Sequence, residues 1–273
     1  MRISYLLPGL VVAMIAKPTM AYNLFDPKPD ADLRELSTDR PDTTESPYTV
    51  DAGHYQLEWE AISSGHDKND GVRTETLTGS INLKAGLSDN IDAQLVLEPH
   101  TRVRITTPEG HDTERGMNDT EVRLKVNMWG NDGGGTAFAI MPFVRLPTHT
   151  SAFGEDGKME GGLILPLAFK LSADWDSAVM LEFDAVRNED NDGYVLEAVQ
   201  SITFGHSIYG ELSGFFEFVN VIRDEHGADN EGYFNAGVMY AIGKSGQLDA
   251  GFNAGITDAA EDFRYFVGLS WRF

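Results

Sequence analysis

The residues in this chain that could act as nucleophile and base are its serines and seven histidines, and their spacing gives little support for catalysis. A serine nucleophile on a sharp strand-to-helix turn has a glycine two positions away on either side. The segment Gly205-His206-Ser207 lacks the second of these glycines. The histidines fall mostly in loops or at strand ends, without a serine at useful spacing. The pattern therefore predicts no enzyme, no catalytic residue and no cofactor.

One acidic motif, Asn188-Glu189-Asp190-Asn191-Asp192-Gly193, imitates the start of a calcium-binding loop. A complete loop of this kind ends on a glutamate that binds the ion through both oxygens. Val199 stands at that position, so we interpret the motif as a solvated turn and predict no metal site. Acidic outer loops could still gather divalent ions from lipopolysaccharide.

A third group of charges lies near the N-terminus, where one arginine stands among acidic residues and prolines. Two interpretations remain open. The segment either folds into a lumen as a plug, with Arg40 paired to inward carboxylates, or is a periplasmic tail that delivers the first strand. Mixed charge and proline restrict its conformations and favour the plug. The predicted plug motif comprises Thr38, Asp39, Arg40, Pro41, Asp42, Glu45, Ser46 and Pro47.

The element that positions these groups is best seen in the last eleven residues, FRYFVGLSWRF. Aromatic and branched side chains occupy every second position, and small or charged residues occupy most of the positions between them. This period of two predicts a strand. The terminal aromatic is typical of the closing strand of a bacterial outer-membrane β-barrel, and the barrel-assembly machinery recognises such a residue. We therefore predict that Trp271 and Phe273 form the assembly signal.

The same alternation runs from Gly53 to the C-terminus and predicts an all-β, transmembrane, antiparallel up-and-down β-barrel of about 12 strands. The eleven earlier strands carry their apolar sets within residues 55–61, 77–85, 93–97, 122–128, 138–146, 163–169, 179–185, 196–204, 212–218, 234–242 and 248–256. Connections alternate in length as barrels require, with short periplasmic turns at 86–90, 130–135, 172–176, 205–207 and 243–246. The longer outer loops are 100–116, 147–160 and 223–231, and 65–70, 188–193 and 257–262 are modest ones. Trp129, Trp175 and Trp271 fall at the predicted periplasmic ends, where an aromatic girdle belongs.

The inward faces of these strands carry both signs of charge, which predicts a network of salt bridges, because buried charges need partners. This network either holds the barrel together or lines a polar conduit, and twelve strands lie between filled and open barrels. Glu58, Glu121, Glu182 and Glu217 are the expected partners of Arg40. The predicted lumen-lining residues are Glu58, Glu60, Lys84, Glu98, Glu121, Arg123, Lys125, Arg145, Lys170, Glu182, Asp184, Glu197, Glu217, Arg264 and Arg272.

Targeting and composition agree with export to an outer membrane. Residues 1–21 read as a signal peptide cleaved after Ala21, residues 22–52 as a segment rich in proline and aspartate, and residues 53–273 as the barrel. The chain has no cysteine and a net charge of -22, which becomes -24 once Arg2 and Lys17 are removed. So acidic a chain is a poor partner for nucleic acid.

A family resemblance covers nearly the whole mature chain. The segment from Thr38 to Val50, TDRPDTTESPYTV, runs into GHYQLE at residues 53–58. It resembles the start of the outer-membrane proteins labelled as transporters or as the MetA-pathway of phenol degradation. Gly86-Leu87-Ser88-Asp89-Asn90 and Leu212-Ser213-Gly214-Phe215 are further echoes, whereas Asn118 replaces a frequent glycine. The resemblance implies an outer-membrane barrel that passes hydrophobic or aromatic small molecules.

Three functions are compatible with these observations. The first is a channel or transporter for a small, apolar or aromatic solute. The second is a closed structural or surface-interaction barrel, and the third is an outer-membrane lipid hydrolase, for which the strand faces supply no adjacent serine and histidine. The expected partners are outer-membrane lipids and lipopolysaccharide, the barrel-assembly machinery and a small-molecule solute, with no nucleic acid.

Overall fold

The computed structural model describes residues 22–153, 157–188 and 193–273. The predicted signal peptide and most of the calcium-like motif lie outside these residues. The elements are η1 (Asp30–Asp32), β1 (Tyr55–Asn69), β2 (Val72–Ser88), β3 (Ile91–Thr107), β4 (Gly110–Gly116), β5 (Thr120–Trp129), β6 (Thr136–Leu146), β7 (Glu160–Lys170), β8 (Trp175–Arg187), β9 (Tyr194–Tyr209), β10 (Leu212–Arg223), β11 (Glu231–Ile242), β12 (Gly246–Gly255) and β13 (Phe263–Arg272).

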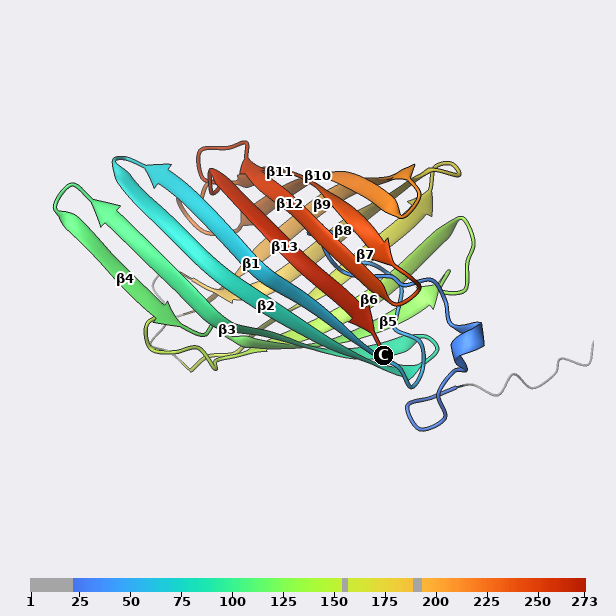
Figure 1. The fold of residues 1–273 in the computed structure, drawn as a ribbon. Helices are drawn as coiled ribbons and strands as arrows, with labels where there is room; N and C mark the ends of the chain where they lie inside the picture. Colours follow the sequence, from blue (N-terminus) through green and yellow to red (C-terminus); the bar gives the residue numbers. More distant parts are fainter. Residues whose placement is uncertain (1–21, 154–156, 189–192) are drawn as a thin grey trace, which may run out of the picture.

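The strands form one closed antiparallel barrel (Figure 1). Each strand of the ring pairs with its neighbours along the chain, and β1 pairs with both β2 and β13, which closes it. Within the described residues, twelve strands make the ring, and the thirteenth, β4, pairs with β3 alone among the named strands. β4 and β5 meet β3 in one register, since Gly116 lies opposite Thr101 and Glu121 opposite Val96. The predicted fold, an up-and-down β-barrel of about 12 strands, is confirmed.

Burial follows the period of two, with the polar side inward. Leu83 and Val267 are 44% and 43% exposed on the outer wall, whereas Glu58 and Lys125 are 2% and 0% exposed inside. A water-soluble protein would show the reverse, because it buries apolar and exposes charged side chains. The outer belt therefore suits lipid, and the interior supplies the polar partners that buried charges require.

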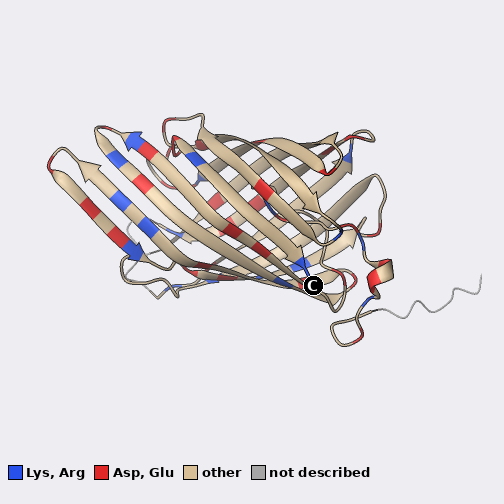
Figure 2. Cartoon of the chain, viewed as in Figure 1, with Lys and Arg blue, Asp and Glu red and all other residues tan. Residues whose placement is uncertain are grey.

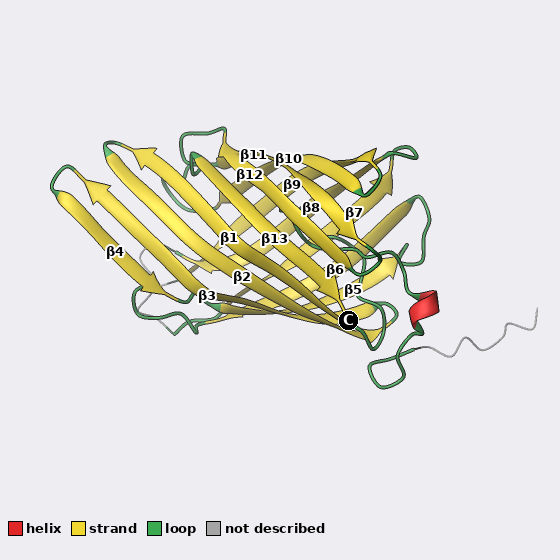
Figure 3. Cartoon of the chain, viewed as in Figure 1, coloured by secondary structure: helices red, strands yellow, loops and turns green. Residues whose placement is uncertain are grey.

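The two ends of the barrel differ. Short turns and the C-terminus gather at one end, called here the turn end, and the opposite end, which carries the longer connections, is the loop end (Figure 3). By the general rule for such barrels, the turn end faces the periplasm. Among the described residues, no helix is long and apolar enough to cross a membrane.

Four local expectations were wrong. A β-bulge between Glu60 and Ile62 turns Ile62 outward, so Ala61 is not the lipid-facing residue there. Residues 100–116, expected as a loop, are the outer half of β3 together with β4. β1 runs through 65–69 and β9 through 205–207, so the turn after β9 lies at 210–211 instead. Charged or small residues mark these stretches, and a strand that rises beyond the lipid belt needs no apolar face.

Candidate functional site

The N-terminal segment lies inside the barrel, where residues 37–51 are held by side chains of the wall rather than by strand pairing. The amides of Thr43 and Thr44 donate to the Glu217 carboxylate at 2.9 and 2.7 Å. Further along, the Val50 amide donates to Asp92 at 3.0 Å. Backbone donors that have left water must find such acceptors. We call residues 37–51 the plug segment.

Asp39 is the most densely bonded residue of the plug segment. Its amide donates to both Glu58 oxygens at 3.1 Å, and its carboxylate lies between the ammonium groups of Lys84 and Lys125. Lys84 also binds Glu58. All four side chains are almost fully buried, so each charge depends on the others for the partners that water would otherwise supply.

Arg40, the next residue, contacts a different part of the wall, on β1 and β12. Its guanidinium donates to Glu60 at 2.9 Å and to Asp249 at 2.7 Å, and lies 5.6 Å from the ring centre of Phe266. Gly268 leaves room for it, because a Cβ there would lie 2.5 Å from the guanidinium. The expected partners were therefore wrong: Arg40 binds Glu60 and Asp249 and none of the four predicted glutamates. Alternation gives the face of a residue, but not its height along the barrel axis.

Three of those glutamates serve other donors. Glu58 binds Lys84, Glu217 accepts from the plug backbone, and Glu121 binds Arg123 and Arg145. Arg123 also reaches Glu45 of the plug segment. From there the pairs continue toward the loop end, where Glu160 binds Arg145 at 3.0 Å and Arg187 at 3.2 Å. The lumen therefore contains the predicted network of alternating charges.

A separate cluster fastens the chain at the turn end. The buried Asp51 carboxylate binds Lys28 at 3.0 Å, Arg34 at 2.7 Å and Arg272 at 3.2 Å. Burial alone would raise the pKa of Asp51, but the charges of Arg34 and Lys28 outweigh it and hold this pKa below its usual value. The cluster links the residues that precede the plug segment to the last strand of the barrel.

One part of the inner wall, on β6, β7 and β8, is apolar. Met141, Phe143, Ile164 and Met180 point inward from β6, β7 and β8 and form one buried cluster. The Glu45 amide lies 3.3 Å from the Met180 sulfur, so the plug segment covers part of this wall. None of these four residues is among the predicted lumen-lining residues, because all of the predicted ones are charged. The β6 sequence TAFAIMPFVRL carries the missed signal, since a strand apolar on both faces is covered on both.

The remaining predicted lumen residues occupy varied positions. Glu98 binds Asn118, Glu197 binds Arg223 at 2.6 Å, and Arg264 binds Glu261 at 2.7 Å near the loop end. Lys170 is exposed at the turn end. Glu182 and Asp184 lie on the inward face of β8, the face that also carries Met180. Inward polar residues absent from the predicted set include Asp92, Gln94, Asn127, Asn235 and Asp249, all nearly fully buried.

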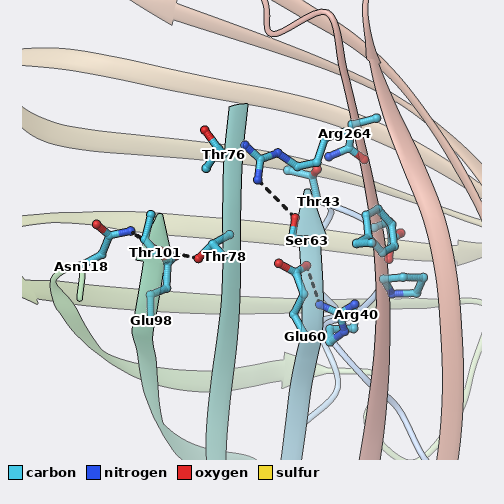
Figure 4. A pocket seen from close by; sticks show the side chains of 14 residues that line it. Arg40, Thr43, Glu60, Ser63, Thr76, Thr78, Glu98, Thr101, Asn118 and Arg264 are labelled. Atoms are coloured by element: carbon cyan, nitrogen blue, oxygen red, sulfur yellow. Dashed lines mark hydrogen bonds and ion pairs between the residues drawn. The ribbon is translucent and has the colours of Figure 1, made fainter. Parts of the chain in front are cut away.

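Above the plug segment the lumen is hollow. A cavity of about 420 Å³ has Arg40, Pro41, Asp42 and Thr43 in its lining, together with polar side chains of the wall (Figure 4). A second cavity of about 390 Å³ is lined by residues that include Arg145, His149 and Glu160. Figure 4 shows Arg40 and Glu60 facing each other within the first cavity, with Thr78 and Thr101 beside them on neighbouring strands. The plug segment thus contributes to the lining of a polar cavity on the side of the loop end.

Residues 38–273 match the model of the family described as "Putative MetA-pathway of phenol degradation". The chain belongs to this family. A search of curated proteins gave no match. Among solved structures, the chain resembles the COG4313 outer membrane channel from Pseudomonas putida F1, with 11% identity, 87% of this chain and 100% of that chain covered, and a TM-score of 0.66.

Other barrels are less similar. The β domain of the Bordetella autotransporter BrkA gives a TM-score of 0.52 at 16% identity, covering 80% of this chain and 98% of that one. The NanC porin gives 0.50 at 9% identity, covering 79% and 98%. At such identities the likeness concerns the fold alone, which is that of outer-membrane β-barrels.

Proposed function

We propose that this protein is an outer-membrane channel for small solutes, in which the plug segment controls the passage. The observation that carries the proposal is that Arg40, Pro41, Asp42 and Thr43 help to line a cavity on the loop side of the plug. The plug segment forms no strand with the wall and is held by side-chain contacts that can be exchanged for water. A filled structural core would need no such cavity above it.

The apolar wall of the lumen indicates the class of solute. Displacing the plug segment would uncover the apolar surface formed by Met141, Phe143, Ile164 and Met180, next to the charged side chains of the lumen. A small aromatic or apolar molecule could follow that surface while water fills the charged side. The family description, which refers to phenol degradation, supports the same class of solute, and the resemblance to the outer membrane channel from Pseudomonas putida F1 supports passage through the barrel. In this proposal the protein is not an enzyme.

Location follows from the same proposal. Residues 1–21 would direct export and be removed, and the assembly machinery would recognise Trp271 and Phe273. Trp271 lies at the turn end, opposite Gly246 in the first position of β12. The lipid-suited belt then lies in the outer membrane with the turn end toward the periplasm.

Ion conductance in planar bilayers and swelling of liposomes by small aromatic solutes test the proposal. The wild-type barrel should conduct weakly, and a variant lacking residues 22–50 should conduct several-fold more and admit the solute faster. Folding of each variant is checked by heat-modifiable migration in detergent gels. A folded deletion variant that neither conducts nor swells liposomes would refute the channel.

That outcome would favour the closed structural barrel, which also has a supporting observation. The plug segment is held at several levels of the lumen, and Lys125 and Glu217 are both 0% exposed beneath it. So many contacts between the plug segment and the wall are compatible with a permanent core as well as with a gate. The deletion variant separates the two, because a permanent core would leave a barrel that fails to fold or stays closed.

A further inference from the structure

The outer ends of β1, β2, β3 and β4 rise above the apolar belt and carry many charges (Figure 2, left). Strand pairing arranges their outward residues in three rows, because residues directly opposite each other in a sheet share a face. The rows are Ser64, Leu77, Arg102 and Arg115; His66, Glu75, Arg104 and Thr113; and Lys68, Arg73, Thr106 and His111. His66 stacks on the exposed Tyr265, which confirms that this face points away from the lumen.

These rows hold five cationic side chains and a single carboxylate, in a chain whose net charge is -22. Within the described part of the chain, none of the five forms an ion pair. The lumen differs sharply, since its arginines and lysines, among them Arg40, Lys84 and Lys125, bind carboxylates. We call Lys68, Arg73, Arg102, Arg104 and Arg115 the basic patch.

The basic patch places like charges at directly opposed positions of neighbouring strands. Lys68 lies directly opposite Arg73, and Arg102 directly opposite Arg115. Like charges at such positions destabilise a sheet. On the other face of the same hairpins, Glu114 lies opposite Val103 and Asp112 opposite Ile105, so the two signs are separated between the faces. An anion bound on the outer face would offset this repulsion.

The height of the basic patch above the lipid belt indicates which kind of anion it would bind. Below the rows, Trp59, Ile81 and Leu97 lie side by side on the outer wall, where the lipid belt begins. The loop end faces outward in the assigned orientation, so the basic patch lies level with the headgroups of the outer leaflet. Guanidinium groups bind phosphate through paired hydrogen bonds. Four neighbouring strands spread these groups over about 14 Å, at roughly 4.8 Å per strand.

We propose that the basic patch binds the phosphate groups of the anionic glycolipid of the outer leaflet, the lipid A part of lipopolysaccharide. An acidic polysaccharide is the other polyanion near this surface, but it has no acyl chains to lie on the apolar wall directly beneath the patch. The inference needs the orientation of the barrel in the membrane and does not depend on conduction through the lumen.

The test measures binding of fluorescent lipid A to the folded, full-length barrel in detergent. A triple variant carrying Arg102→Gln, Arg104→Gln and Arg115→Gln should bind about 100-fold more weakly, since each cation near an anionic lipid surface contributes about fivefold. Removing both phosphates from the lipid A should weaken binding to the wild type by a similar factor. Higher salt should weaken binding to the wild type more than to the variant.

A matched pair of single variants controls for net charge. Arg104→Gln and Lys244→Gln remove one positive charge each, and Lys244 is exposed at the turn end, far from the patch. The first should lose about fivefold in affinity and the second should keep it. Equal losses would mean that net charge alone controls binding, which would overturn the proposal.

Thermal unfolding gives an independent readout. Without lipid A, the triple variant should melt at or above the wild-type temperature, because repulsion between Arg102 and Arg115 is removed. Added lipid A should raise the melting temperature of the wild type only. The proposal is overturned if the triple variant or dephosphorylated lipid A binds as strongly as its reference. It is also overturned if polygalacturonate binds the patch more tightly than lipid A does.

Discussion

Removing the Arg40 side chain should release the plug segment while the barrel stays folded. The substitution Arg40→Ala leaves Asp249, whose side chain is 0% exposed, and Glu60, which is 19% exposed, without their cation. Breaking a buried pair costs about 3–5 kcal/mol. Glu60 borders the polar cavity and can recover water there, so we expect a cost near the lower end, about 3 kcal/mol. This cost corresponds to roughly a 100-fold larger population of released segments.

Hydrogen exchange measures that population directly. The amides of Thr43 and Thr44 are both bonded to Glu217, so their exchange requires these bonds to open, as they do when the segment departs. Their exchange should therefore accelerate about 100-fold in Arg40→Ala, while amides in the middle of the barrel strands keep their protection. Conductance in planar bilayers should rise in the same variant.

The matched control is Arg223→Ala. Arg223 binds Glu197 at 2.6 Å near the loop end, but its side chain is 39% exposed, so the pair contributes less than about 1 kcal/mol. Exchange at Thr43 and Thr44 should stay at the wild-type rate in this control. The reasoning is refuted if Arg40→Ala changes that exchange by less than threefold in a folded barrel, because Arg40 would then not anchor the segment.

Three further variants test other anchors of the N-terminal region. Glu217→Gln presents an amide to the plug backbone donors and should loosen the segment by about 2–3 kcal/mol, read as faster exchange in a barrel with unchanged gel migration. Gly268→Ala places a methyl 2.5 Å from the Arg40 guanidinium and should mimic its loss in part; unchanged exchange would contradict this steric account. Asp51 has a lowered pKa, so its stabilisation is complete above about pH 4 and is lost as the pH falls through that lowered pKa. Protease cleavage within residues 28–34 should therefore increase in acid for the wild type, and Asp51→Asn should show high cleavage at all pH values.

Sequence alternation predicted the faces of nearly all strands, because only lipid outside and polar groups inside satisfy both environments at once. Leu83 and Val144 point outward and Lys125 and Glu217 point inward, as their positions in the pattern required. The orientation of Ala61 was predicted wrongly because a β-bulge shifts the pattern by one residue, and nothing in the local composition indicates this bulge. The strands at 100–116 were missed for another reason. β4 carries charged residues on both faces, and the outward face of the outer half of β3 carries Arg102 and Arg104, so the apolar outer face that marks a membrane strand is missing.

The partners of Arg40 could not be predicted, because they depend on the height at which the plug segment stops. Asp39 sets that height through contacts on both of its polar groups: its amide meets Glu58, and its carboxylate meets Lys84 and Lys125. A slip of one residue would bring the Arg40 guanidinium against two buried ammonium groups and remove the Asp39 carboxylate that both of them bind, which would leave Glu58 as the acceptor of Lys84. The cost of unpaired charge inside the barrel makes such a slip prohibitive. With Asp39 in place, Arg40 can reach only the carboxylates of β1 and β12, which are Glu60 and Asp249.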